Sequence, residues 1–322
     1  GDSVALFPAP DLSGEQEQEV LAITQAISAA LQARGLLNVQ MVLYQGRIHV
    51  LEVNPRASRT VPALSKVSGV PMVALATRVQ LGERLRDLWL GPELVRSALR
   101  PGRVAAKVPV FSSGKLRDAE VALGPEMRST GEVLGIGDHF GAALYRGFEA
   151  AGLLPAEPFI LLSAPRHASA KIAALVQRLS SRGWRFAATP GTAERLATLG
   201  AEVTAVSRAD AESLITRELV GGALLIANHP GRPEEAGFRL RRLCAEFALP
   251  YYGAVETLAA VASALEARAS ASGVRQLPPM RALSPVAASA SASASAAAYT
   301  SAGSGSAPAP APATGLSAAQ LP

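Results

Sequence analysis

The chain has 322 residues, 49% of them hydrophobic, and is therefore long enough for two ordinary globular domains. No uninterrupted apolar run approaches the roughly 18 to 20 residues that span a bilayer, so a membrane protein is not expected. With 5% aromatic residues and a modest net charge of +5, the chain suits an anionic small molecule better than a nucleic acid. The single cysteine, Cys244, excludes a disulfide framework and a thiolate zinc cluster. It fits a reducing compartment, which would be the cytoplasm, or a plastid in a eukaryote.

The first part of the chain combines helix and strand patterns. Apolar residues recur at helical spacing over residues 14–34, which predicts an amphipathic helix. Residues 38–44 and 47–53 are two apolar β runs separated by a Gln-Gly turn, which predicts a hairpin. Helical spacing returns over residues 70–81. We therefore predict an α+β piece at this end.

A second region alternates strand and helix. Short apolar runs predict strands at 159–162, 185–188, 202–206 and 223–227. Amphipathic segments predict helices at 169–182, 192–199, 237–248 and 255–267. Strands that alternate with helices of about 8 to 14 residues imply βα units and a parallel sheet, so the overall fold class is α/β.

The last 53 residues have a different composition. From residue 270 onward the chain is rich in alanine, serine and proline and has few charges or large apolar groups. Such a segment cannot bury enough surface to offset backbone ordering, which costs about 1–2 kcal/mol per residue. We predict three parts: an α+β piece with a connecting segment over 1–150, a parallel-sheet domain over 151–269 and a disordered tail over 270–322.

The strongest chemical signal lies in the predicted hairpin. Strand alternation places Glu52 and Asn54 on one face, and Gln40 on the paired strand can lie opposite them. Three oxygen-bearing side chains from adjacent strands are typical of a Mg²⁺ site, since magnesium takes oxygen ligands and usually keeps waters and substrate phosphates. The alternative interpretation is that these are solvated polar residues at a strand end.

Two arginines follow directly. Arg56 and Arg59 offer guanidinium groups to phosphate or carboxylate oxygens, just past Pro55. A divalent metal beside arginines is the arrangement that phosphoryl transfer requires, because the metal neutralises developing charge and the arginines position the anion.

The whole string around these residues resembles a known family. Residues 52–62 (EVNPRASRTVP) and 65–71 (SKVSGVP) resemble the ATP-grasp signature of the carbamoyl-phosphate synthase large subunit. Residues 123–135 (LGPEMRSTGEVLG) resemble a second block of that family, and residues 1–3 resemble the loop before its last ATP-grasp helix. In that family a methylglyoxal-synthase-like domain follows the second ATP-grasp copy, which is where the parallel-sheet region lies here.

The resemblance implies a reaction and roles for named residues. It matches Gln40, Glu52 and Asn54 to metal-binding positions for Mg²⁺ or Mn²⁺, Asn54 and Arg56 to ATP-binding positions, and Arg56 and Arg59 to catalytic positions beside the phosphates. The implied reaction is ATP-dependent phosphorylation of carbamate, within synthesis of carbamoyl phosphate from bicarbonate, an ammonia donor and ATP. A glutaminase subunit or domain is the expected partner, and the full-length subunits are expected to form oligomers.

An ATP-grasp fold also requires an upstream lobe with a lysine and a glycine-rich loop over the phosphates. Nothing before Gly1 is present to supply them, and the downstream lysines do not lie in such a context. We therefore expect the chain to be a fragment or C-terminal piece that is inactive in isolation.

The parallel-sheet region carries a second candidate site. Thr189, Gly191 and Thr192 lie between a predicted strand and a predicted helix, where free N–H groups and the helix dipole attract anions. This loop resembles the phosphate loop of methylglyoxal-synthase-like domains, where nucleotide effectors bind, and Asn228 matches another effector-side position. The alternative interpretation is an ordinary helix cap by Thr192.

This region departs from the family pattern. Ser169 replaces a lysine that often contacts phosphate, although Lys171 and Arg166 are near in sequence, and residues 204–205 replace an Asn-Lys pair. Loss of two charged or polar donors weakens anion binding. The usual pyrimidine or purine effector is therefore expected to bind poorly.

The remaining candidates have structural interpretations. For residues 123–135 a scaffold role is favoured over direct substrate contact, with Arg128 and Glu132 as an exposed helical pair. His139, His167 and His229 lack ligand spacing and read as structural or surface groups. Cys244, between apolar neighbours, reads as a buried thiol.

Two other functions are consistent with parts of the sequence. A stand-alone module that senses a small anion or nucleotide would leave residues 52–59 without a purpose. A methylglyoxal synthase would carry an aspartate in a Gly-Gly-Asp stretch, whereas the corresponding loop, 230–235, reads PGRPEE. The ligase interpretation ranks first.

Overall fold

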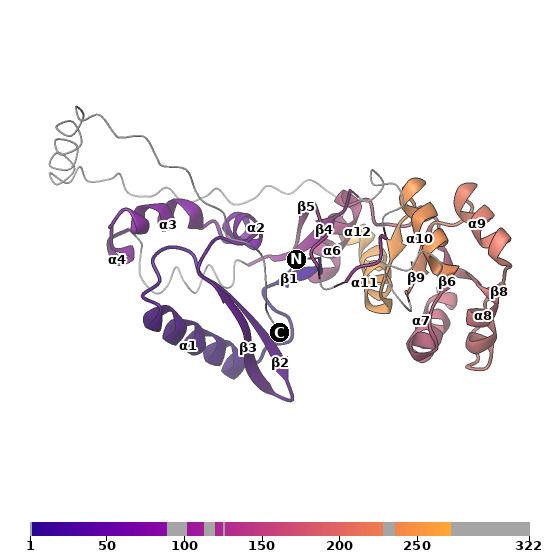
Figure 1. The fold of residues 1–322 in the computed structure, drawn as a ribbon, viewed down its shortest axis with the longest axis horizontal. Helices are drawn as coiled ribbons and strands as arrows, with labels where there is room; N and C mark the ends of the chain where they lie inside the picture. Colours follow the sequence, from indigo (N-terminus) through magenta and orange to yellow (C-terminus); the bar gives the residue numbers. More distant parts are fainter. Residues whose placement is uncertain (1, 89–101, 113–119, 125, 228–235, 272–322) are drawn as a thin grey trace, which may run out of the picture. The chain divides into compact units, whose positions relative to one another are not determined.

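The computed structural model describes residues 2–88, 102–112, 120–124, 126–227 and 236–271 (Figure 1). Their fold is mixed α/β with a parallel sheet, so the predicted fold class is confirmed. Of the tail predicted over 270–322, all but the first two positions lies outside the described residues. In the described part of the chain, every helix is too short or too polar to cross a membrane.

The first helix and the hairpin follow the sequence prediction closely. Helix α1 (Gly14–Ala30) begins at a capping box, in which Ser13 and Gln16 satisfy each other's backbone N–H groups, and it ends four residues before the predicted limit. Strands β2 (Asn38–Tyr44) and β3 (Arg47–Asn54) pair antiparallel. The turn between them has two residues with positive φ, 49° and 76°, the requirement of a two-residue type I′ hairpin.

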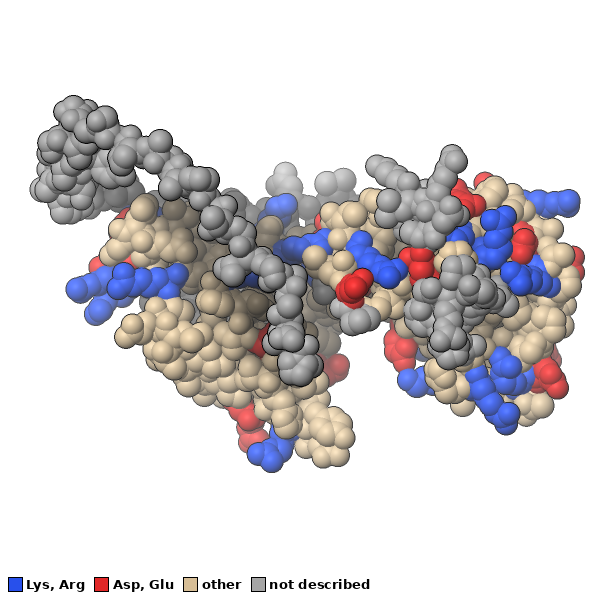
Figure 2. All heavy atoms as spheres, in the orientation of Figure 1, with Lys and Arg blue, Asp and Glu red and all other residues tan. Residues whose placement is uncertain are grey.

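Apolar side chains of this region face outward. No residue of α1 is buried, although the helix runs alongside the hairpin in Figure 1. Figure 2 accordingly shows a largely uncharged face over α1 and the hairpin. Six large apolar side chains in this part are between 39% and 62% exposed, namely Leu31, Val42, Leu43, Tyr44, Val50 and Leu51.

Three short helices follow the hairpin. Helix α2 (Thr60–Ser68), which the sequence patterns did not predict, ends at Gly69 with a left-handed φ of 70°. Helix α3 (Met72–Gln80) confirms the helix predicted over 70–81, and α4 (Leu85–Leu88) is a single turn. Together they carry the chain away from the end of β3.

A three-stranded antiparallel sheet then forms from segments distant in sequence. Its order is β1-β4-β5, with β1 (Ala5–Phe7), β4 (Val104–Val110) and β5 (Gly131–Gly137). Helix α6 (Phe140–Ala150) packs on it. The sequence patterns predicted none of these four elements, and the β1–β4 pairing joins residues about a hundred positions apart.

The parallel sheet confirms the predicted βα units. Its order is β10-β9-β6-β7-β8, and its strands are β6 (Phe159–Ser163), β7 (Arg185–Ala188), β8 (Thr204–Ala205), β9 (Gly222–Leu225) and β10 (Tyr251–Tyr252). The helices of this region are η2 (Arg166–Ala168), α7 (Ser169–Ser180), α8 (Pro190–Ala197), α9 (Arg208–Thr216), α10 (Ala236–Glu246), α11 (Val255–Glu266) and α12 (Arg268–Ala271). Of these, the sequence analysis did not predict α9, β10, η2 or α12.

The sheet buries both faces. On β6, Ile160 and Leu162 join one apolar cluster while Leu161 joins a cluster on the other face with residues of α9 and α10. The first cluster also contains Val108 of β4 and Phe148 of α6, so a single apolar core continues across residue 150. The predicted division between 150 and 151 stays a prediction.

Close packing of α6 on β5 depends on glycine. A Cβ on Gly135 would overlap the Ala143 carbonyl oxygen and lie 2.5 Å from the Gly147 nitrogen, both in the backbone of α6. Backbone atoms cannot rotate away as a flexible side chain can. The absence of a Cβ at Gly135 is therefore what allows the helix to approach the strand.

Gly135→Ala should destabilise the chain by about 3 kcal/mol or more, because the helix must move away from the strand. Urea unfolding followed by circular dichroism measures this loss. Gly131→Ala is the matched control, since a Cβ at Gly131 in the same strand meets nothing within 4 Å. Equal stability of the two variants would contradict the packing argument.

Candidate functional site

The hairpin brings the three predicted metal ligands together. Gln40 pairs with Glu52 across the ladder, and Asn38 pairs with Asn54. Asn54 Nδ2 donates a hydrogen bond to Glu52 Oε1 at 2.9 Å, which confirms that these two side chains share a face. Gln40 and Glu52 are exposed and Asn54 is half-buried.

The donor set is chemically suited to a hard divalent cation. The Asn54–Glu52 hydrogen bond uses the amide nitrogen, so Asn54 Oδ1 is not consumed by it. One carboxylate and two amide oxygens match the oxygen preference of Mg²⁺, which keeps water and phosphate in its remaining positions. Within the described residues no three His, Cys, Asp or Glu side chains are grouped to hold a metal. A cation at this hairpin would therefore depend on its amide oxygens.

The two predicted arginines have different surroundings. Arg56 is exposed, and its Nη1 donates to the Ala57 carbonyl at 3.0 Å. Arg59, at the N-terminal end of α2, is instead held by a segment about seventy residues later. Its Nη1 donates to Ser129 Oγ at 2.9 Å and to the Ser129 carbonyl at 3.3 Å, and it lies 2.9 Å from Met127 Sδ.

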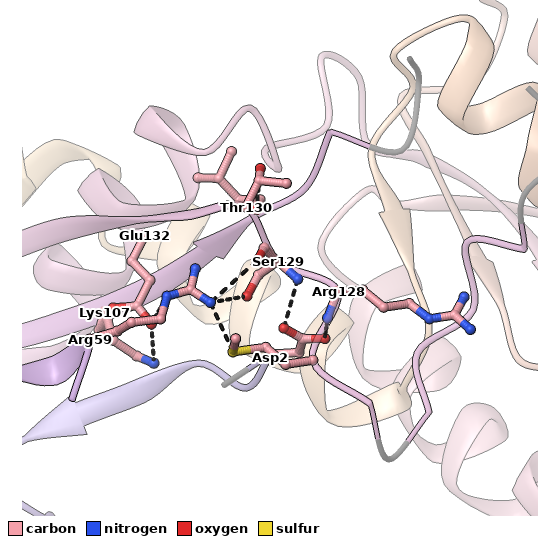
Figure 3. A network of polar contacts seen from close by, with 9 residues as sticks. Asp2, Arg59, Lys107, Arg128, Ser129, Thr130 and Glu132 are labelled. Carbon is pink, nitrogen blue, oxygen red and sulfur yellow. Dashed lines mark hydrogen bonds and ion pairs between the residues drawn. The ribbon is translucent and has the colours of Figure 1, made fainter. Parts of the chain in front are cut away.

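Figure 3 shows this network from close by. Glu132 lies on β5 and receives Lys107 Nζ of β4 at 3.1 Å and Arg59 Nε at 3.6 Å on the same Oε1 oxygen. Lys107 is only 9% exposed, so its charge requires a partner, which Glu132 provides. Two cations thus converge on one carboxylate.

Asp2 closes the network on the other side. Its two carboxylate oxygens accept the main-chain N–H groups of Arg128 at 2.7 Å and Ser129 at 2.9 Å. Partial burial acts to raise the pKa of Asp2, but its hydrogen bonds to Ser129 and Arg128 outweigh this and lower the pKa below its ordinary value. Asp2 is therefore held as a carboxylate that fixes the backbone beside Arg59.

The block 123–135 has a scaffold role in these contacts, as expected, but not as a helix. Its described part is an extended loop that runs into β5, so the interpretation of Arg128 and Glu132 as a helical pair is wrong. Glu132 pairs with Lys107 and Arg59 instead. The sequence analysis missed Lys107 and Asp2; a lone lysine inside the apolar run 104–110 was the available signal for the first.

The second candidate site, at the start of α8, is braced by hydrogen bonds among the chain's own groups. Thr189 is the N-cap residue and makes no side-chain cap bond; its Oγ1 lies 3.2 Å from both Ser163 Oγ and Thr192 Oγ1. Thr192 is buried inside the first turn and accepts the Ala164 N–H at 3.2 Å. Thr192 is thus not the cap of this helix, and Gly191 is exposed beside it. Asn228 and His229 lie outside the described residues.

Arg195 was not predicted for this loop. Its Nη2 donates to the Ala164 carbonyl at 2.6 Å and to Thr192 Oγ1 at 3.3 Å, and its Nε donates to Ser169 Oγ at 3.3 Å. A cation therefore contacts the buried Ser169. Lys171 does not serve there, because its Nζ pairs with Glu256 of α11 at 2.7 Å.

The remaining candidates are structural. His139 caps α6, with Nδ1 accepting the Ala142 N–H at 3.3 Å, and His167 is exposed. Cys244 is fully buried, which confirms the predicted buried thiol, and burial raises its pKa to about 12. A thiol with that pKa is not a nucleophile at neutral pH.

Arg195→Ala should lower the free energy of unfolding by about 1–2 kcal/mol, because it removes charge-assisted hydrogen bonds to a half-buried loop. Chemical denaturation measures the change. Arg178→Ala, on the exposed face of α7, is the control and should be within about 0.5 kcal/mol of the parent chain. A loss no larger than the control's would show that Arg195 does not brace the loop.

The amino-acid sequence of the chain is similar to that of known proteins. Residues 1–88 match the model of the family described as carbamoyl-phosphate synthase L chain, ATP binding domain. The chain is 40% identical over 269 residues to the carbamoyl phosphate synthase large chain of Clostridium beijerinckii, covering 81% of this chain and 25% of the relative. Against the large chain of Thermoanaerobacter sp. it is 40% identical over 268 residues, covering 82% and 24%.

A third relative agrees. The large chain of Clostridium perfringens is 39% identical over 268 residues, again 81% of this chain and 25% of the relative. The chain thus spans about a quarter of the length of the relatives it matches. The described hairpin and all of α4 fall within the family match. The chain belongs to the carbamoyl phosphate synthase large-chain family and corresponds to its C-terminal region.

Proposed function

We propose that the chain forms the metal-binding wall of an ATP site that phosphorylates carbamate to carbamoyl phosphate. The observation that supports this most directly is the cluster of Gln40, Glu52 and Asn54, which shares one face of a hairpin inside the segment matching an ATP-binding domain. Relatives named carbamoyl phosphate synthase large chain match the same region at about 40% identity. Neither an isolated carboxylate nor a fold match alone would carry the proposal.

Glu52 supplies the negative charge of the site. Its carboxylate would hold Mg²⁺ or Mn²⁺ together with the amide oxygens of Gln40 and Asn54. A bound divalent ion supplies charge neutralisation on the nucleotide phosphates. The existing Asn54–Glu52 hydrogen bond holds the two side chains in place before any cation binds. Such preorganisation reduces the ordering cost of binding.

Arg56 and Arg59 would have different roles in phosphate binding. Arg56 is exposed at the end of the hairpin and would bind phosphate oxygens through its guanidinium group. Arg59 is already bonded to Ser129 and Glu132, so its place is set by the protein before ATP arrives. An arginine held in this way can stabilise charge without reorganising at the moment of transfer.

The parallel-sheet region would act as a methylglyoxal-synthase-like regulatory domain. Its Thr189–Thr192 loop lies at the C-terminal end of β7, where ligands of parallel sheets commonly bind. Because Ser169 and Arg195 replace the family's lysine arrangement, we expect altered rather than typical nucleotide selectivity. A glutaminase partner would deliver ammonia to the complete enzyme.

Glu52→Gln should weaken Mn²⁺ binding at least about tenfold, because it removes the carboxylate from the proposed ligand set. Electron paramagnetic resonance titration with Mn²⁺, with and without ATP, measures this. Glu19→Gln, on the exposed surface of α1, is the control and should bind as the parent chain does. Equal Mn²⁺ affinity of Glu52→Gln and the parent would refute the metal assignment.

The ligase activity requires a second experiment, because the chain covers only a quarter of its relatives. This chain should replace the corresponding region of the Clostridium beijerinckii large chain and preserve ATP-dependent carbamoyl phosphate formation from ammonia. The same chimera with Glu52→Gln should lose at least about a hundredfold in kcat. The isolated chain should show no bicarbonate-dependent ATPase; clear turnover by it alone would overturn our expectation of inactivity.

A further inference from the structure

A buried ion pair joins α10 to the segment that precedes the 123–135 block. Arg241 of α10 is 1% exposed, and its guanidinium binds the Glu120 carboxylate in a bidentate manner, Nε to Oε1 at 2.9 Å and Nη2 to Oε2 at 2.6 Å. The Glu120 side chain is 6% exposed. This bidentate pair, with both side chains almost fully buried, links α10 firmly to Glu120.

Further hydrogen bonds connect Glu120 to the backbone after it and to Arg128. Its Oε1 also accepts the Ala122 N–H at 2.9 Å, which fixes the turn after it. Its carbonyl oxygen accepts Arg128 Nη1 at 2.6 Å. The Arg128 side chain therefore connects the 123–135 block to Glu120, which is paired with Arg241 of α10.

Arg128 is the point at which two sets of contacts meet. In Figure 3 its side chain extends away from Asp2, while its main-chain N–H faces the Asp2 carboxylate. The next residue, Ser129, donates to the same carboxylate and accepts the Arg59 guanidinium on both its hydroxyl and its carbonyl. Consecutive polar contacts thus run from Arg241 to Arg59 without a gap.

We propose that Arg128 is a positioning residue, through which the buried Arg241–Glu120 pair sets the location of Ser129 and hence of the Arg59 guanidinium. Movement of α10 in the parallel-sheet region is then transmitted to the arginine beside the candidate metal site. The assignment of Arg59 to the phosphates rests on the proposed function, but the mechanical connection does not.

Three features indicate that a displacement of α10 would reach Arg59 and not be taken up by local rearrangement on the way. The arginine at each step is a rigid planar fork, so a shift of its partner rotates or displaces the whole group. Asp2 fixes two consecutive amides, which prevents Ser129 from turning independently. Ser129 is itself buried, which limits the space into which its hydroxyl can turn.

Hydrogen exchange of the whole chain tests the connection. Arg241→Met should speed amide exchange at Arg128 and Ser129 at least tenfold. Arg182→Met, which breaks the exposed Arg182–Glu266 pair in the same half of the chain, is the control and should leave these amides unchanged. If Arg241→Met affects only α10 and residues 120–122, the proposal is wrong.

Arg128 itself is tested by rescue. Arg128→Met should shift and broaden the Arg59 Nε–H resonance, whereas Arg128→Lys, which can still donate to the Glu120 carbonyl, should restore it. Equal spectra for both variants would refute the positioning role. Should Arg241→Met fail to fold, Glu120→Gln keeps the side-chain shape, removes the charge and should give the same exchange pattern.

These readouts separate the inference from the proposed function. Neither exchange nor the Arg59 resonance requires ATP or a metal. If Glu52→Gln left Mn²⁺ affinity unchanged while exchange coupling persisted, the metal assignment alone would fail. If exchange coupling were absent while Glu52→Gln lost Mn²⁺ binding, the positioning role alone would fail.

Discussion

The register of the β2–β3 hairpin is the constraint on which the candidate site depends. Gln40 lies opposite Glu52, and the ladder shifts by one residue immediately beyond, between Gln40 and Met41. A slip of one residue along either strand would send that strand's polar side chains to the opposite face. The positive φ values of Gln45 and Gly46 define the turn and, with the bulge, hold the register that keeps the oxygens together.

Outside the hairpin, charged side chains bind groups from distant parts of the chain. Lys107 and Arg59 converge on Glu132, and Asp2 binds the backbone of residues 128 and 129. Lys107 and Glu132 have side chains about one-tenth exposed, so their interaction is screened little by solvent. The result is an Arg59 whose position is determined by the antiparallel sheet, although it follows the hairpin in sequence.

The parallel-sheet region is physically continuous with that sheet. A common apolar core contains residues of β4, α6, β6 and α11, and the Arg241–Glu120 pair adds a polar attachment. In its own candidate loop, Arg195 donates to Thr192, Ser169 and the Ala164 carbonyl, and Thr192 accepts the Ala164 N–H. In this chain the loop is stabilised internally by these contacts.

Local patterns were sufficient for much of this chain. Strands 38–44 and 185–188 and the helices α7, α8, α10 and α11 were predictable because their periodicity and end signals lie within about fifteen residues. The same local alternation placed Glu52 and Asn54 on one face. The resemblance of residues 52–62 to a family signature supplied their chemistry.

Only the tertiary structure revealed the contacts between segments that are distant in sequence. Strands β1, β4 and β5 form one sheet although residues 5 and 107 are far apart in sequence, and no local pattern encodes that choice. For the same reason the sequence indicated Arg59 only as a phosphate ligand, while its bonds to Ser129 and Glu132 required the folded chain. Arg195 likewise meets Ser169 and the Ala164 carbonyl only when α8 packs against α7. Local sequence determines which face a side chain occupies, and packing between remote segments determines what that side chain meets.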